Sequence, residues 1–397
     1  MLFRSLSRVV PLYKANDPSS CDNYRPIALQ SCFSKILEKA VFFQLSNHLE
    51  LNNLLHPNQY GFQKSKSTEH NLFSLINFVS TAINDNNYCI GVFLDLRKAF
   101  DVCTHSTLLK KLKHMGIKDL ALKWFESYLS NRTQKVDING TLSDAEFINI
   151  SVLQGSILGP ILFLIYINDL PDCTSLFTLL FADDTQALAK GNDLPTLVAH
   201  VNHELQKIAT WFKANRMAIN VDKTKYILFH NKGRKFSQTD LSIVYNDNEP
   251  GLDDPDMIKP IERIHSNHTN PTLRYYKSLG ILLDEHLSFT HHISYLHSKL
   301  SKTIFILNRA KNFLLPKILK TIYYSIFHSH LTYCPTILAC ASNTLINRIF
   351  LLQKKAIRII SNAKYSDHTD PLFKRQDRKS TRLNSSHTVI SYAVFCL

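Results

Sequence analysis

The sequence predicts an α/β fold over roughly the first 285 residues, followed by an α-helical domain. Two observations carry this prediction. Up to residue 286, short apolar runs of strand length alternate with stretches whose apolar residues recur at helical spacing. Beyond it, residues 289–362 are basic and mostly helical in pattern. We therefore expect one domain over 1–286 and a second, helical one over 287–376.

Composition and charge narrow the function classes. The chain has 397 residues, of which 45% are apolar and 20% charged, which is ordinary for a globular protein and excludes disorder. Its longest apolar stretches, 161–167 and 176–182, fall far short of the roughly 20 residues that cross a bilayer, so we expect no membrane span. The net charge of +14 favours a polyanionic partner, although many basic proteins bind none. The N-terminus makes a poor signal peptide, and we expect an intracellular protein, nuclear or cytoplasmic.

Eight cysteines are scattered through the chain. None lies in a C-x-x-C pair or in a cysteine–histidine grouping at zinc spacing, which argues against a disulfide framework and against a zinc site. We expect reduced thiols, most of them in the core.

The chain begins with two predicted helices. Residues 34–50 and 68–84 carry apolar residues at helical spacing, and Ser34 is a candidate N-cap of the first helix. The polar segment between them contains Pro57 and Gly61 and is typical of a loop or a short strand.

Strands and helices alternate from residue 89 onward. An apolar, β-branched run at 89–96 predicts a strand, and amphipathic patterns at 98–116 and 120–129 predict helices. Asn139–Gly140 between alternating runs is the strongest short signal for a hairpin. The remaining predicted elements are a helix at 157–170, a strand–turn–strand at 177–189, a helix at 194–214, a strand at 225–229, a looped-out polar insertion at 231–272 and a last strand at 279–283.

Carboxylates follow the predicted strands at two places. Asp95 ends an apolar strand, and Asp183 and Asp184 occupy the turn between two others. Aspartate is common in turns for conformational reasons, so the pair by itself indicates only a hairpin. Two strand-borne carboxylate sites brought together would instead bind Mg²⁺, which prefers oxygen ligands. Two such ions clamp the attacking and leaving oxygens of an in-line displacement, so the arrangement predicts phosphoryl transfer.

A third candidate is the loop QGSILGP at 154–160, which precedes an apolar helix. Its two glycines and its proline are compatible with a tight helix entry alone. A backbone with so few side chains also allows a nucleotide or template base to approach closely. The loop is therefore a candidate substrate-binding segment.

Together and in this order, the motifs resemble those of reverse transcriptases, in particular the enzymes of non-LTR (LINE-type) retrotransposons of the jockey/CR1 kind. The resemblance covers residues 9–376. It implies a right-hand polymerase, with fingers and palm around a small sheet and then a helical, thumb-like domain. The motifs are, in chain order, YRPIAL (24–29), QYGFQKSKST (59–68), FLDLRKAFD (93–101), WFESYLSNR (124–132), LQGSILGPILFLIYINDL (153–170), FADDT (181–185), KTKYILF (223–229), SLGILLD (278–284) and LQKKAIRII (352–360).

The resemblance assigns roles to the carboxylates. Asp95 and Asp183 match the two catalytic, metal-binding aspartates of the palm, and Asp184 is a further ligand or a structural carboxylate. Leu96 could offer its backbone carbonyl to the metal. The implied cofactor is Mg²⁺, with Mn²⁺ as the alternative ion.

The resemblance also implies substrate contacts. Phe100 matches the aromatic residue that stacks under the sugar and excludes a 2′-OH. Gln154 and Gly155 match the loop that supports the template and the incoming nucleotide. Lys223 matches the lysine proposed to donate a proton to the leaving pyrophosphate, although Lys225 is close enough to leave that choice open.

In the fingers, Arg25 and Lys64 would face the triphosphate or the template, as would Lys66. A solvated, charged face that binds no substrate explains Lys64 and Lys66 nearly as well. The implied partners are an RNA template, a DNA primer and dNTPs. We recognise neither an upstream endonuclease nor a downstream RNase H domain in the chain.

Three positions depart from the family pattern. Leu153 replaces the proline usual before Gln-Gly-Ser, Gln63 replaces an arginine of the fingers, and Arg97 replaces a small residue. None removes a metal ligand, but a catalytically inactive, nucleic-acid-binding remnant of a decayed element remains the alternative hypothesis. A viral RNA-dependent RNA polymerase is disfavoured, because such enzymes typically carry aspartate where Phe100 stands.

The last 21 residues look foreign to the rest of the chain. Residues 377–397 fit neither helical nor strand periodicity and resemble a translated sequencing adapter along most of their length. We expect them to be an assembly artefact that makes no persistent contacts.

Overall fold

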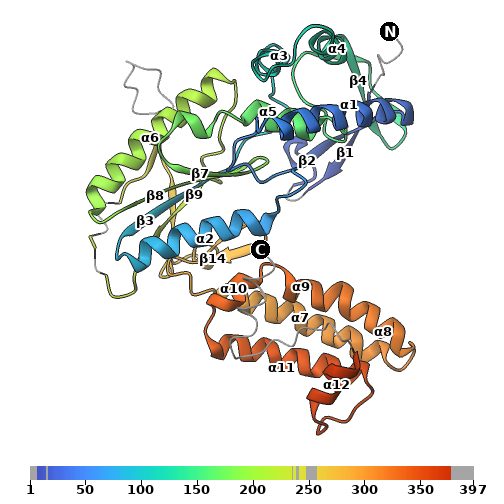
Figure 1. Ribbon diagram of the computed structural model, residues 1–397, viewed down its shortest axis with the longest axis vertical. Helices are drawn as coiled ribbons and strands as arrows, with labels where there is room; N and C mark the ends of the chain where they lie inside the picture. Colours follow the sequence, from blue (N-terminus) through green and yellow to red (C-terminus); the bar gives the residue numbers. More distant parts are fainter. Residues whose placement is uncertain (1–6, 15–16, 235, 238–240, 247–256, 377–397) are drawn as a thin grey trace. The chain divides into compact units, whose positions relative to one another are not determined.

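The computed structural model describes residues 7–14, 17–234, 236–237, 241–246 and 257–376 (Figure 1). The predicted artefact at 377–397 lies outside these residues. The chain divides into two compact units, of which the first comprises residues 1–71, 87–226 and 235–262 and the second 72–86, 227–234 and 263–397. Neither unit is continuous in sequence, and the functional division into 1–286 and 287–376 stays a prediction.

An antiparallel sheet lies at the centre of the first unit. β3 (Tyr88–Leu94) pairs with β8 (Asp184–Gly191), which pairs with β7 (Phe177–Phe181). All seven residues of β3 are buried, as its uninterrupted apolar run predicts. α6 (Leu194–Ala214) packs across β3 and β8 through buried residues at helical spacing (Figure 1). These strands and this helix confirm the elements expected at 89–96, 177–189 and 194–214.

A second sheet of the first unit contains two strands that the patterns did not predict. β1 (Ser7–Tyr13) pairs antiparallel with β2 (Tyr24–Leu29) and parallel with β4 (Arg132–Ile138). Pro11 and Pro26 face each other in this register, and prolines weaken the strand signal in a sequence. β4 also pairs with β5 (Thr141–Leu142) and β6 (Glu146–Ile148), which confirms the hairpin at Asn139–Gly140.

The helices of the first unit agree with their patterns except at two starts. The N-cap of α1 (Cys32–Leu51) is Ser31, whose Oγ accepts from the backbone N–H of Ser34, so Ser34 as N-cap was wrong. α3 (His105–His114) begins later than expected, because residues 100–103 hydrogen-bond to residues 151 and 152 instead. The others are α4 (Asp119–Leu129), α5 (Gly159–Ile167) and 3₁₀ turns at Cys21–Asn23 and Pro171–Cys173.

The polar insertion at 231–272 is more ordered than predicted where the structure describes it. β10 (Val244–Asn246) pairs with β11 (Ile258–Pro260), and β12 (Glu262–Ile264) and a 3₁₀ turn (Pro271–Leu273) follow. The last predicted strand is in fact a hairpin of β13 (Tyr276–Ser278) and β14 (Ile281–Leu283).

The second unit is largely a helical bundle, as predicted for 289–362 (Figure 1). A core of mostly aliphatic side chains runs from Ile293 to Phe373. No helix among the described residues is long and apolar enough to cross a membrane. The unit contains most of α2 (Thr68–Asn84), the end of β9 (Lys225–Phe229), and α7 (Thr290–Ala310), α8 (Pro316–Ile322), a π-helix (Tyr323–His328), α9 (Ser329–Thr332), α10 (Pro335–Cys340), α11 (Asn343–Ile360) and α12 (Thr369–Gln376).

Three of the seven described cysteines are buried, which is fewer than the sequence led us to expect. The buried ones are Cys89, Cys103 and Cys334.

Candidate active site

The three predicted carboxylates lie at one end of the central sheet. Asp95 directly follows β3, and Asp184 is the first residue of β8. The last printed pair of these strands is Leu94 with Thr185, so Asp95 and Asp184 are the next residues along the same register. Asp183 precedes Asp184 in the two-residue turn between β7 and β8. The antiparallel pairing therefore joins two sites that are almost 90 residues apart in sequence.

Hydrogen bonds with residues 59–61, in the predicted fingers, hold the aspartate turn in place. Ala182, at the head of the turn, has a left-handed φ of 56°. Its N–H donates to Gln59 Oε1 at 3.2 Å, and the N–H of Gly61 donates to the same oxygen at 2.8 Å. The N–H of Tyr60 donates to the carbonyl of Leu180 at 2.8 Å. A buried glutamine side chain and a backbone bridge thus fix where the carboxylates stand.

The carboxylates repel one another. Burial, with the charge of Asp183, raises the pKa of Asp95, while Lys223 and Lys14 oppose the rise. Burial raises the pKa of Asp184 to about 6, and the charges of Asp183 and Asp95 add to this effect. Part of the Asp184 side chain is nevertheless exposed to solvent. The site therefore accumulates negative charge that the two lysines offset only in part.

This donor set fits a divalent cation. Carboxylate oxygens are preferred ligands of Mg²⁺. A cation would offset the burial of negative charge, which is the main cause of both raised pKa values, and the smaller repulsion between the carboxylates. The backbone of Asp95 is turned toward residues 218–224, since its N–H donates to Thr224 Oγ1 at 3.2 Å and its carbonyl accepts from Asn220 at 2.7 Å. Carbonyls alternate along a strand, so that of Leu96 lies on the opposite side, toward β8.

The structure separates the two lysine candidates. Lys225 forms an ion pair with Glu262 at 2.8 Å and donates to the carbonyl of Asp222, with its side chain only 15% exposed. Lys223 is exposed, and its charge acts on Asp95. Of the two, Lys223 is the cation that interacts with the carboxylates.

Phe100 and Gln154 lie on segments that hydrogen-bond to each other. The carbonyl of Phe100 accepts from the N–H of Val152 at 2.8 Å, and its half-buried ring stacks on Phe163 with centroids 4.5 Å apart. The Gln154 amide donates to Asp101 Oδ1 at 3.2 Å. The pKa of Asp101 is raised by burial, and this hydrogen bond partly offsets the rise.

Gly155 occupies a position that only glycine suits. Its φ is +107°, and a Cβ there would lie 2.6 Å from the carbonyl oxygen of Ala28 on β2. The N–H of Ala28 donates to the carbonyl of Gln154 at 2.8 Å. The predicted substrate loop is therefore bonded to the strand that also contains Arg25.

A buried carboxylate anchors the same loop from α1. Glu38 is 2% exposed, and its Oε2 accepts from the N–H of Ile157 at 2.7 Å. Its Oε1 accepts from the hydroxyl of Tyr128 at 2.6 Å. Burial raises the pKa of Tyr128, so this hydroxyl stays a donor.

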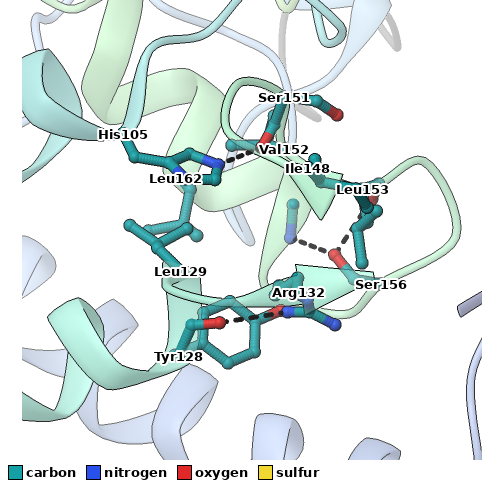
Figure 2. A pocket seen from close by; sticks show the side chains of 11 residues that line it. His105, Tyr128, Leu129, Arg132, Ile148, Ser151, Val152, Leu153, Ser156 and Leu162 are labelled. Carbon is teal, nitrogen blue, oxygen red and sulfur yellow. Dashed lines mark hydrogen bonds between the residues drawn. The ribbon is translucent and has the colours of Figure 1, made fainter. Parts of the chain in front are cut away.

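A small pocket lies beside this loop (Figure 2). Ser156 Oγ donates to the Leu153 carbonyl at 3.0 Å, and Arg132 stacks its guanidinium 4.6 Å from the Tyr128 ring centroid. His105 Nε2 is 3.0 Å from the carbonyl oxygen of Ser151. No carboxylate lines the pocket, so it belongs to the support of the loop and not to the charged site.

The two predicted cations of the fingers are exposed. Arg25 lies on β2 and Lys64 in the loop before α2. Among the described residues, neither side chain forms an ion pair with Asp95, Asp183 or Asp184. Lys66 instead donates to the carbonyls of Pro57 at 2.5 Å and Gln59 at 2.9 Å, which is a structural role.

Sequence reasoning missed four residues of this site. They are Lys14, Glu38, Gln59 and Thr224. Gln59 lies in a motif quoted above, but its spacing to the aspartates carries no signal. The contacts of Lys14 and Thr224 depend on strand pairing, which a single sequence does not reveal.

Asp184→Asn should raise the midpoint temperature of unfolding of the metal-free protein at pH 7.5, because it removes a partly desolvated negative charge and its repulsion with Asp183 and Asp95. The folded-state pKa of about 6 lies above the ordinary 3.8, so the wild-type penalty is fully present above pH 6. It shrinks as the pH falls and is absent below about 3.8. Thermal unfolding with a chelator from pH 4 to 8 measures this, and Asp144→Asn, in an exposed loop, is the control. A gain that does not depend on pH would contradict the expectation.

Comparison with known proteins identifies the family of the chain. The family model described as "Reverse transcriptase (RNA-dependent DNA polymerase)" matches residues 13–282. The chain is 27% identical to the RNA-directed DNA polymerase from mobile element jockey of Drosophila melanogaster, over 91% of this chain and 38% of that protein. It is 26% identical to the probable RNA-directed DNA polymerase from transposon BS of the same species, over 97% of this chain and 43% of that protein. The chain thus spans about two fifths of the length of these relatives.

Among solved structures, apo telomerase from Candida tropicalis is similar with a TM-score of 0.46 and 12% identity, over 100% of this chain and 66% of that chain. The family match spans more than half of this chain and confirms the expected right-hand polymerase architecture. It also removes the viral RNA polymerase alternative. The chain belongs to the reverse transcriptase (RNA-dependent DNA polymerase) family and is homologous to the polymerases of jockey-type non-LTR retrotransposons.

Proposed function

We propose that this chain is the RNA-directed DNA polymerase segment of a non-LTR retrotransposon, which transfers nucleotides from dNTPs to a primer 3′-OH on an RNA template. The observation that carries the proposal is the cluster of Asp95, Asp183 and Asp184 at one sheet end. Burial, and to a smaller extent the neighbouring carboxylates, raise the pKa of Asp95 and of Asp184, and perturbed groups gathered at one point are typical of functional sites.

Asp95, Asp183 and Asp184, with the carbonyl of Leu96, would hold Mg²⁺ or Mn²⁺. Bound there, the ions would lower the charge on the attacking and leaving oxygens of an in-line displacement. The chain itself fixes the positions of the three carboxylates, through the β3–β8 register and the hydrogen bond between Gln59 and the aspartate turn.

Two lysines act on the same site from different segments. Lys223 would donate a proton to the leaving pyrophosphate, which its exposure and its interaction with Asp95 support. Lys14 also acts on Asp95 and would face the triphosphate. Arg25 and Lys64 would extend this positive surface along the fingers toward the triphosphate or template.

The loop at Gln154 and Gly155 would support the template and the incoming nucleotide. Three hydrogen bonds support that role. Ala28 N–H donates to the carbonyl of Gln154, and Ile157 N–H donates to Glu38. The side-chain amide of Gln154 donates to Asp101. A loop held in this way offers a preorganised surface to a base. The partners are an RNA template, a DNA primer and dNTPs, and the net charge of +14 suits polyanionic partners.

Primer extension tests the proposal directly. The purified chain is incubated with a labelled DNA primer on an RNA template, dNTPs and Mg²⁺, and products are resolved by length. Extension that depends on the template sequence supports the polymerase. Binding of the primer–template without any extension would support the alternative, a catalytically inactive remnant.

Phe100→Ala should admit ribonucleotides, because the ring that excludes a 2′-OH is removed. Phe163, which is fully buried, backs Phe100 and keeps its ring in place. We expect the ratio of dNTP to NTP incorporation efficiency to fall by roughly tenfold or more. Phe100→Tyr, which keeps the ring, should retain the wild-type ratio, and so should Phe313→Ala at an 85% exposed site. An unchanged ratio in Phe100→Ala would remove Phe100 from this role.

A further inference from the structure

Three potential metal ligands converge in the second unit, in residues that the polymerase site does not use. His230 directly follows β9, and Glu285 and His286 follow β14. His230 Nε2 lies 3.9 Å from Glu285 Oε2, and His286 Nε2 lies 3.7 Å from Glu285 Oε1. The three ligand atoms all lie within 4.8 Å of one another. Two segments that are 55 residues apart in sequence thus present two imidazoles and one carboxylate to a common point.

Hydrogen bonds of the backbone fix which nitrogen of each ring faces this point. His230 Nδ1 is 2.8 Å from the carbonyl oxygen of Asn231, and His286 Nδ1 is 3.1 Å from the carbonyl oxygen of His230. A carbonyl only accepts, so each Nδ1 is the donor. In a neutral imidazole this leaves the lone pair on Nε2, the atom that faces Glu285. Metal-bound histidines are oriented in the same way, with the second nitrogen donating to a carbonyl.

The spacing does not suit direct hydrogen bonds. Both contacts of the histidines with Glu285 are longer than the 2.7–3.2 Å of an N–H···O bond. Zinc bonds of about 2.0–2.2 Å in a tetrahedron set ligand atoms about 3.3 Å apart, which small side-chain rotations would reach. The three ligand atoms, which lie within 4.8 Å of one another, are therefore close enough for an ion to bridge them after such rotations.

Burial and neighbouring hydrogen bonds hold the cluster in place. Lone pairs of two imidazoles and a carboxylate face one another in a site where His230 and Glu285 are buried. Arg263 lies 3.3 Å from Glu285 Oε2, and the N–H and hydroxyl of Ser266 donate to Oε1. These contacts orient the carboxylate.

We propose that His230, Glu285 and His286 bind a zinc ion, which joins the end of β9 to the segment between β14 and α7. Two nitrogens and one carboxylate oxygen are a donor set for Zn²⁺ and not for Mg²⁺. The site is therefore chemically distinct from the aspartate cluster. Cysteine spacing argued against zinc in this sequence, but it could not detect ligands that come from two distant segments.

The test uses the purified full chain, stripped with a chelator and then exposed to ZnCl₂ in excess Mg²⁺, which keeps the aspartate cluster occupied. Bound zinc is counted by mass spectrometry, and Co²⁺ replaces zinc to report the geometry in visible absorption. We expect one zinc per chain, a tetrahedral cobalt spectrum without a thiolate band, and a rise in the unfolding temperature. His230→Gln and His286→Gln should each weaken zinc binding by at least about 100-fold. His368→Gln, with a side chain 83% exposed, should bind like the wild type.

Equal zinc binding in both variants would overturn the proposal, as would a cobalt–thiolate band, which would place the ion on cysteines. Absence of zinc binding in the wild type would overturn it too. Circular dichroism confirms that each variant is folded, and His286 is the safer position because its side chain is partly exposed. Zinc binding is measured without nucleotide or template, so its result is independent of polymerase activity.

Discussion

Asp183→Asn should reduce the rate of RNA-templated primer extension by roughly 10³-fold or more, because it removes a carboxylate from the group that would hold the metal ions. The substitution keeps the size of the side chain, and the exposed position of Asp183 places no packing demand on it. The two-residue turn and the Gln59 contact remain in place. The variant should therefore bind primer–template as the wild type does while its chemical step is slow. Single-turnover extension measures the chemical step, and a separate titration measures the affinity for primer–template.

Asp144→Asn is the matched control. Asp144 is an exposed aspartate of the same unit, in the loop between β5 and β6, and its substitution should leave extension unchanged. Equal extension by Asp183→Asn and the wild type would refute the assignment of the site. A loss that appears equally in the control would trace to handling of the protein and not to the carboxylate.

Much of the fold follows from local sequence signals. Helices such as α6 and buried strands such as β3 carry a strong apolar period, and their ranges agree with the patterns to within one or two residues. β1 and β2 were missed because they are mostly exposed or half-buried and contain facing prolines. The start of α3 was wrong because residues 100–103 bond to a segment nearly 50 residues away, and such a partner overrides the helical pattern.

The candidate site divides in the same way. The aspartates could be found because each lies at or next to the end of a strand, where a carboxylate is conspicuous beside an apolar run. The choice between Lys223 and Lys225 could not be made, since both are lysines of one short segment. The ion pair of Lys225 with Glu262 and the effect of Lys223 on the pKa of Asp95 separate them in the structure. The supporting contacts of Gln59 and Glu38 arise from tertiary packing and have no local signature.

Gly61→Ala should lower the extension rate by about 100-fold even though Gly61 touches neither metal nor substrate. A Cβ at this position would lie 2.4 Å from the backbone nitrogen of Ala182 and 3.1 Å from its Cα. Backbone atoms cannot swing aside as the end of a flexible side chain would. The aspartate turn or the Gln59 segment must therefore shift, and Asp183 and Asp184 would shift with it.

The effect of Gly61→Ala should fall on the chemical step more than on binding, because the displaced groups are the carboxylates. Gly233→Ala is the control, since a Cβ there would meet nothing within 4 Å, and it should leave both extension and unfolding temperature unchanged. The measurement compares single-turnover rates and primer–template affinity for the two variants. A Gly61→Ala protein that extends primers at the wild-type rate would show that the turn tolerates displacement. The contact between residues 59–61 and the aspartate turn would then be irrelevant to activity. A selective loss of the chemical step would instead establish that Gln59 and Gly61 set the position of the catalytic carboxylates.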